Sequence, residues 1–114
     1  MIIQGANEPI VLIFKGDLST MQDFSSVLVN KASLTVMKRW AKDDIFLGEP
    51  YEDEETGETL TPVTLPLEQD ETLLFQFGTA VLQTKWMLED SVWFADDQEI
   101  HIKRAFDETL LTGD

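Results

Sequence analysis

The sequence predicts an all-β, antiparallel fold, a sandwich or a barrel of seven or eight short strands with one or two short helical turns. Runs of apolar and β-branched residues recur about every 8–12 residues, and turn-forming residues separate them. No long stretch shows the 3.6-residue period of an amphipathic helix. A chain of 114 residues that is 43% hydrophobic is expected to fold as a single domain, residues 1–114, around one core.

The first strand is predicted over Ile10–Phe14. An unbroken run of β-branched and large apolar residues follows Pro9 there, and it ends at the turn-forming sequence Lys15-Gly16-Asp17. Because no polar residue interrupts the run, we expect this strand to be mostly buried.

The next segment combines a helical signal with a strand signal. Ser19–Gln22 has the spacing of a capping box, which favours one helical turn near residues 20–24. A longer helix is not expected, because residues 25–30 are mainly poor helix formers. Residues 25–29 are therefore predicted to form the second strand.

A third strand is predicted over residues 34–40, followed by a polar turn at residues 42–44 and a short strand over Ile45–Leu47. Alternation places one set of side chains of the third strand on a common face: Leu34, Val36, Lys38 and Trp40.

An acidic insertion occupies about residues 48–61. Gly57 can adopt the positive φ that a tight reversal needs, so the segment is predicted to be an exposed, self-repelling hairpin or a floppy loop. Calcium takes oxygen ligands from such acidic loops, although the spacing of an EF-hand is absent. The candidate calcium ligands are Glu52, Asp53, Glu54 and Glu55.

Residues 63–65 return to the core, and the flanking Pro62 and Pro66 predict a sheet edge or a strand end there. Residues 68–71 indicate a polar helical turn, and residues 72–75 re-enter the core.

The clearest strand follows Gly78, and two further strands are expected at residues 92–95 and 99–104. Residues 106–114 form either a closing strand or a frayed tail. The core face of the strand after Gly78 carries Ala80, Leu82, Thr84, Trp86 and Leu88.

The charge balance limits the classes of partner. The chain has 22 acidic and 8 basic residues, a net charge of −14 and a pI near 4.1. Nucleic acid and anionic membranes are therefore not expected to bind. The acidic surface serves either solubility or the docking of a basic partner or divalent cations. With no cysteine, the chain has no disulfide or thiolate metal site.

Catalytic signals are weak. His101, the only histidine, alternates with Ile100 and Ile102 and is expected to face solvent. No serine has the glycines of a nucleophile elbow, and the carboxylate pairs lie at predicted turns, where water keeps them ionised. A carboxylate-based hydrolase is the only chemistry left open. We assign no catalytic, cofactor-binding or metal residues and expect a protein that is not an enzyme and needs no cofactor.

Four aromatic residues allow either core packing or a carbohydrate-stacking platform: Trp40, Trp86, Trp93 and Tyr51. Trp86 is expected in the core. If Val92 and Phe94 are core residues, alternation exposes Trp93, which makes it the best marker of a contact surface. The candidate interface comprises Trp93, Tyr51, Glu52, Asp53, Glu54 and Glu55.

Leu65-Pro-Leu-Glu-Gln-Asp-Glu-Thr-Leu-Leu-Phe-Gln-Phe-Gly78 resembles the L-x-L-x-Q-x-E-T-L-x-F-x-x-G core of small phage and prophage structural proteins. The opening strand, residues 23–30 and the tail from residue 106 extend the similarity to the immunoglobulin-like N-terminal domain of baseplate upper proteins from phages of Gram-positive hosts. The acidic insertion departs from that pattern.

The resemblance implies an Ig-like β-sandwich in a non-enzymatic tail or baseplate component of a virion. It implies partners among other phage structural proteins or copies of the chain itself. The protein is expected to be made in the bacterial cytoplasm without a signal peptide, since the first ten residues lack a basic region and Ile10–Phe14 is too short for a signal core. The alternative is a small ligand-binding module for calcium or carbohydrate.

Overall fold

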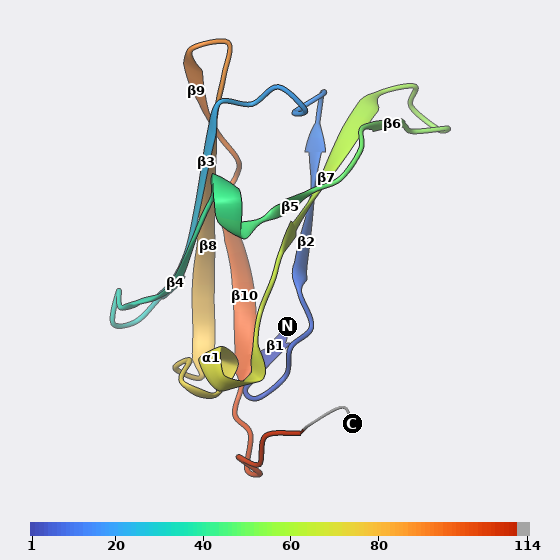
Figure 1. Cartoon of the computed structure of the whole chain (residues 1–114). Helices are drawn as coiled ribbons and strands as arrows, with labels where there is room; N and C mark the ends of the chain where they lie inside the picture. Colours follow the sequence, from blue (N-terminus) through green and yellow to red (C-terminus); the bar gives the residue numbers. More distant parts are fainter. Residues whose placement is uncertain (112–114) are drawn as a thin grey trace.

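Two β-sheets pack face to face in the computed structural model, which describes residues 1–111 (Figure 1). The larger sheet has the order β1 (Ile2–Ile3), β10 (Gln98–Lys103), β8 (Gly78–Leu88), β3 (Asp23–Asn30) and β4 (Val36–Ala41), and β9 (Ser91–Phe94) also pairs with β8. The smaller sheet has the order β2 (Ile10–Lys15), β7 (Thr59–Leu65) and β5 (Phe46–Leu47), and β6 (Tyr51–Glu52) also pairs with β7. Two short helical elements, η1 (Lys42–Asp44) and α1 (Gln69–Leu73), complete the description.

The predicted antiparallel, Ig-like sandwich is confirmed. Across residues 1–111 seven strands have four residues or more, and β1, β5 and β6 have two residues each. Every pairing is antiparallel except that of β1 with β10. The orders β10-β8-β3-β4 and β2-β7-β5 place the strands where immunoglobulin domains have G-F-C-C′ and B-E-D. In the part of the chain described, no helix is long and apolar enough to cross a membrane.

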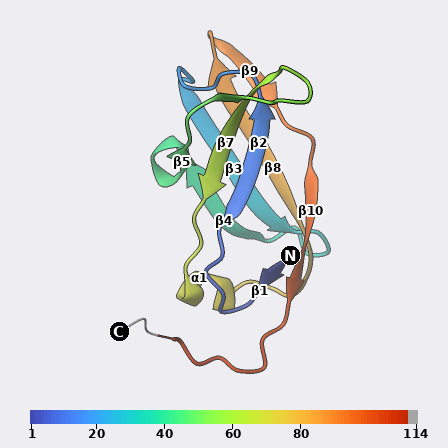
Figure 2. The same ribbon diagram turned by 90° about the vertical axis from the view of Figure 1, so that its right-hand side faces the viewer.

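The smaller sheet lies in front of the larger sheet in Figure 2, and the core lies between them. Strand alternation determines which side chains reach the core. On β8 the predicted face is confirmed, because Ala80, Leu82 and Thr84 are buried while Trp86 and Leu88 pack partly against the core. The Trp86 ring contacts Phe14 of β2, with ring centroids 4.9 Å apart, and so joins the two sheets.

The prediction that Ile10–Phe14 is mostly buried is wrong. Leu12 and Phe14 face the core, but Val11 and Ile13 are exposed on the outer side of the smaller sheet. The unbroken apolar run therefore belongs to a strand with one covered face and one uncovered apolar face.

Of the two places predicted for residues 63–65, the strand end is confirmed, because β7 ends at Leu65. The sheet edge is wrong, because β7 is the central strand of the smaller sheet. Pro62 is tolerated there because its missing N–H falls between β5 and β6, where pairing on that side of β7 is interrupted. The Gly48 N–H donates to the Pro62 carbonyl at 2.8 Å, and a Cβ at Gly48 would lie 2.5 Å from the proline ring. The close contact of Gly48 with Pro62 therefore lies at the interruption between β5 and β6.

The predicted third strand starts later than expected. Leu34 is an exposed turn residue with φ of 59°, and regular pairing begins at Val36. A register shift between Leu28 and Val29 of β3 places Val36 on the outer face, whereas Lys38 and Trp40 pair with inward-facing residues of β3. The predicted common face of residues 34–40 is therefore divided by the bulge.

Residues 65–78 close one end of the sandwich. The helical turn is confirmed as α1, Phe75 is buried in the core, and Gly78 has φ of 116° where the chain enters β8. The buried Thr72 hydroxyl donates to the Ala6 carbonyl at 2.7 Å and accepts from the Gly5 N–H at 2.9 Å. Thr72 therefore anchors the chain segment before β2 to α1.

Two other predictions concern irregular segments. No helical turn forms over residues 20–24, because β3 already begins at Asp23. From residue 106 to residue 111 the tail has no regular strand, although the Leu111 backbone exchanges two hydrogen bonds with the Gln69 amide. The remainder of the predicted tail, residues 112–114, lies outside the described residues.

Substituting Thr72→Val is expected to lower the free energy of unfolding by about 1–3 kcal/mol, because it leaves the Gly5 N–H and the Ala6 carbonyl without their buried partner. Urea denaturation measures the change. Thr64→Val on the outer face of β7 is the matched control, expected to stay within about 0.5 kcal/mol. Equal stability of the two variants would contradict the anchoring role of Thr72.

Candidate functional site: two apolar surfaces

The structure brings Trp93 and the acidic hairpin to the same end of the sandwich but leaves them on different sheets. The β8–β9 hairpin extends from the larger sheet, the β6–β7 hairpin extends from the smaller sheet, and the connection from β2 to β3 runs along this end between them (Figure 1). The residues of the candidate interface therefore do not form one patch. Each part has its own environment.

Trp93 is exposed, as expected, but the reason given for its exposure is wrong. Val92 and Phe94 are not core residues: the exposed fractions are 52% for Val92, 54% for Trp93 and 63% for Phe94. The smaller sheet does not cover this hairpin, so both faces of β9 lie in solvent (Figure 1). The whole strand, rather than one indole, forms the exposed surface.

The turn of this hairpin has an uncommon backbone. Glu89 and Asp90 have φ of 51° and 63°, in the left-handed region that favours glycine and asparagine in two-residue turns. Gln22, just before β3, holds the turn through both groups of its amide: Nε2 donates to the Asp90 carboxylate at 2.8 Å, and Oε1 accepts from the Asp90 N–H at 2.7 Å. Contacts outside the hairpin therefore support its strained turn.

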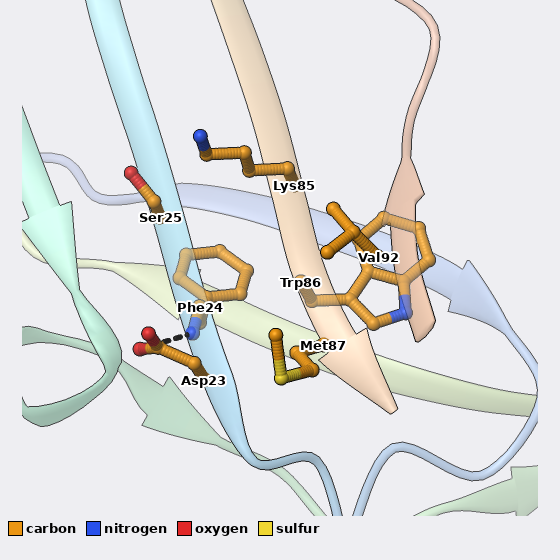
Figure 3. Close-up of a pocket in the computed structure, with 7 residues that line it drawn as sticks. All are labelled: Asp23, Phe24, Ser25, Lys85, Trp86, Met87 and Val92. Carbon is orange, nitrogen blue, oxygen red and sulfur yellow. Dashed lines mark hydrogen bonds between the residues drawn. The ribbon is translucent and has the colours of Figure 1, made fainter. Parts of the chain in front are cut away.

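A shallow groove of about 190 Å³ lies beside the hairpin, where β3, β8 and β9 meet (Figure 3). Cross-strand pairs place Asp23, Met87 and Val92 in one row and Ser25 and Lys85 in the next. One carboxylate and one ammonium thus border an apolar floor. The groove is lined by Asp23, Phe24, Ser25, Lys85, Trp86, Met87 and Val92.

The acidic insertion forms a hairpin, the first of its two expected structures. Gly57 has the positive φ expected of it, 71°, and its N–H donates to the Asp53 carbonyl at 2.8 Å. The Asp53 carboxylate accepts from the Glu55 N–H and the Thr56 hydroxyl, so it stabilises the turn. Among the residues described, no three acidic or histidine side chains are grouped closely enough to hold a metal ion, and the candidate calcium ligands do not converge.

A third polar turn lies in the β2–β3 connection at the same end. The Ser19 hydroxyl and backbone N–H bind the Asp17 carboxylate and hold its pKa below the usual range of an aspartate. This carboxylate therefore remains charged and contributes to the acidic character of that end.

The aromatic residues do not form a stacking platform. Trp40 is only 1% exposed, and its indole N–H donates to the Pro66 carbonyl at 2.9 Å, so it is a core residue. Trp86 is half-buried, which leaves Trp93 and Tyr51 on the surface. His101 faces solvent from β10, as predicted.

A second surface, which was not predicted from the sequence, is the outer face of the smaller sheet. Strand pairing aligns Val11 with Thr64 and Phe46, and Ile13 with Pro62. The next row contains Lys15, Leu60 and Tyr51. Exposed or half-buried apolar side chains thus lie next to one another on β2, on β7, and on β5 and β6, which both pair with the other side of β7. We call this surface the apolar face; it comprises Val11, Ile13, Phe46, Tyr51, Leu60, Pro62 and Thr64.

The apolar face contains no acidic residue, although the chain has 22 of them. Its charged neighbour, Lys15, lies beside Glu58 with its Nζ 3.8 Å from a carboxylate oxygen. The sequence signal for this surface is the pair of outward-facing apolar residues in β2, Val11 and Ile13. They give β2 the composition of a strand that is buried on both faces.

The chain matches no protein-family model. It also matches no curated protein.

Substituting Glu89→Gly is expected to raise the free energy of unfolding by about 0.5–1 kcal/mol, because glycine adopts the left-handed region without the penalty that a larger side chain meets there. Thermal and urea denaturation measure the change. Ser91→Gly, two residues away in a regular strand, is the matched control and should be destabilising. Destabilisation by both substitutions would show that the turn is not strained.

Proposed function

We propose that this protein is a non-enzymatic structural component of a phage or prophage virion, of the tail or baseplate kind, that assembles through protein–protein contacts. The observation that carries the assembly role is the apolar face of the smaller sheet. A solvated monomer gains nothing from exposing Val11, Ile13 and Phe46 side by side, whereas a patch of this kind is typical of an interaction site. The virion assignment rests on the resemblance carried by residues 65–78.

The proposed occupant of the apolar face is a second copy of the chain. Two copies that each carry a net charge of −14 repel one another wherever their carboxylates meet. The apolar face brings no carboxylate of its own to the contact and can pack on a copy of itself around a two-fold axis. A basic partner would gain no charge complementarity there.

The size of the apolar face indicates a weak contact. Three strands about 4.8 Å apart, with about five residues each at about 3.3 Å per residue, give a footprint of roughly 14 by 17 Å. Stable dimers bury about 800 Å² on each partner, which is considerably more. We therefore expect concentration-dependent association that becomes firm only when many copies are held together, as in a ring or a tail.

The chemistry of the buried polar side chains in residues 1–111 favours a non-enzymatic role. The buried polar residues among those described are hydroxyl and amide side chains: Ser26, Asn30, Thr61, Thr72 and Thr84. Acid–base catalysis by a carboxylate needs an environment that shifts its pKa, and burial is the usual means.

Light scattering coupled to size-exclusion chromatography tests the proposal. The wild-type mass is expected to rise above the 13.0 kDa monomer as protein concentration increases, and to rise further at high salt, where repulsion between acidic copies is screened. Ile13→Lys should return the mass towards the monomer at every concentration, because it places a charge in the centre of the contact.

Val36→Lys is the matched control, since Val36 is also an exposed β-branched residue, on the outer face of the larger sheet (43% exposed, against 51% for Ile13). It should leave the association unchanged, and both variants should fold as the wild type does. A monomer at all concentrations and salts, or equal effects of the two substitutions, would overturn self-association through the apolar face.

A further inference from the structure

The free edge of β9 is a second binding element with a different chemistry. The Ala95 N–H donates to the Thr84 carbonyl at 3.0 Å, which sets the phase of the β8–β9 ladder. Because hydrogen-bonding direction alternates along an antiparallel strand, Val92 and Phe94 direct their N–H and C=O groups away from β8. Within residues 1–111 no strand pairs with that side of β9.

The side chains of β9 do not protect this edge. Natural edge strands commonly carry a lysine, a proline or an inward-pointing charge that prevents pairing with another chain. Here Val92, Trp93 and Phe94 are uncharged, and each is more than half exposed. Such an edge can accept an added strand, whose alternate side chains then meet Trp93 on one face and Val92 and Phe94 on the other.

Acidic residues lie at both ends of this apolar edge. Glu89 and Asp90 precede β9, Asp96 and Asp97 follow it, and all four are exposed. Attraction between opposite charges therefore favours a strand with basic residues at its ends.

A second copy of the chain does not meet that requirement. An antiparallel pairing of β9 with β9 lets the free N–H and C=O groups of Val92 in one copy bond to those of Phe94 in the other. It places Trp93 of one copy opposite Trp93 of the second copy. It would place Asp90 opposite Asp96 of the second copy, and Glu89 opposite Asp97, at both ends of the pair. Like charges directly opposite one another on paired strands are destabilising.

We propose that the β9 edge binds an extended segment of a different protein, with an uncharged centre and lysine or arginine at its ends, by adding it as a strand to the larger sheet. This inference builds on the proposed assembly role, but it uses a surface that the apolar face does not share. The chain would then have one contact for its own copies and another for a basic partner.

Titration with a synthetic peptide, followed by amide NMR, tests the proposal. The probe alternates threonine and valine and carries two lysines at each end; a control peptide carries glutamates instead. The lysine peptide is expected to shift the amide signals of Val92 and Phe94 and to bind at least about tenfold more tightly than the glutamate peptide, with affinity falling as salt increases. N-methylation of alternate peptide nitrogens should abolish binding, because it removes the ladder donors.

Two variants separate this site from the apolar face. Trp93→Ala should weaken peptide binding at least about fivefold without unfolding the protein, and Ile13→Lys should leave it unchanged. Equal binding of both peptides, or shifts confined to other strands, would overturn the proposal. If Ile13→Lys loses self-association but still binds the lysine peptide, the result supports the proposed β9 site. If the wild type is a monomer that binds the lysine peptide, the result contradicts only the proposed contact through the apolar face.

A charge exchange provides an independent test. Glu89→Lys combined with Asp96→Lys makes each like-charge pair of the β9–β9 register an opposite pair, while it keeps Asp90 and its contact with Gln22. In an Ile13→Lys background this double variant should lose the lysine peptide and form a dimer of its own. A monomer that still binds the lysine peptide would show that the acidic residues do not select the partner.

Discussion

The pairing of β8 with β3 is the interaction on which the rest of the structure depends. Eight residue pairs join the two strands, from Asp23 with Met87 to Asn30 with Ala80. The other edge of β8 carries β9 and β10 in succession, with a one-residue shift in pairing between them. Its inner face supplies the side chains that pack against the smaller sheet, and Trp86 reaches Phe14 there. One long strand therefore positions both the core and the projecting hairpin.

Charge divides the surface of this sandwich into regions with different uses. Most of the acidic residues lie in turns and hairpins, where water solvates them. The apolar face of the smaller sheet is free of carboxylates, so a copy of the chain can approach it. The β9 edge has carboxylates at both ends, so the chemistry of its partner is different. Because the net charge is large, we expect the surfaces without carboxylates, and those with carboxylates at fixed positions, to determine which partners can bind.

Exposed apolar strands account for most of the differences between the predicted and the observed fold. The apolar run of β2 predicts burial of Val11 and Ile13, and the exposure of Trp93 was tied to the condition that Val92 and Phe94 are core residues, yet all four of these apolar residues are exposed. An edge or interface strand with apolar residues on both faces has the same composition as a strand buried on both faces. Val36 and Pro62 show a second limit: a bulge in the partner strand changes the face of Val36, and a break in pairing admits Pro62 to a central strand, without any signal in the neighbouring sequence.

By itself, the sequence determined the all-β class, the position of nearly every strand, the positive φ of Gly57, and the exposure of the acidic hairpin. These properties depend on local backbone preference and on a period of two, which neighbouring residues encode. Only the tertiary structure decided which of two apolar faces is covered, that β7 is central, and that β9 extends past the smaller sheet. Whether a face is covered depends on strands that are distant in the sequence. Alternation with a period of two divides the residues of a strand between its two faces, but it does not show which face packs against another sheet.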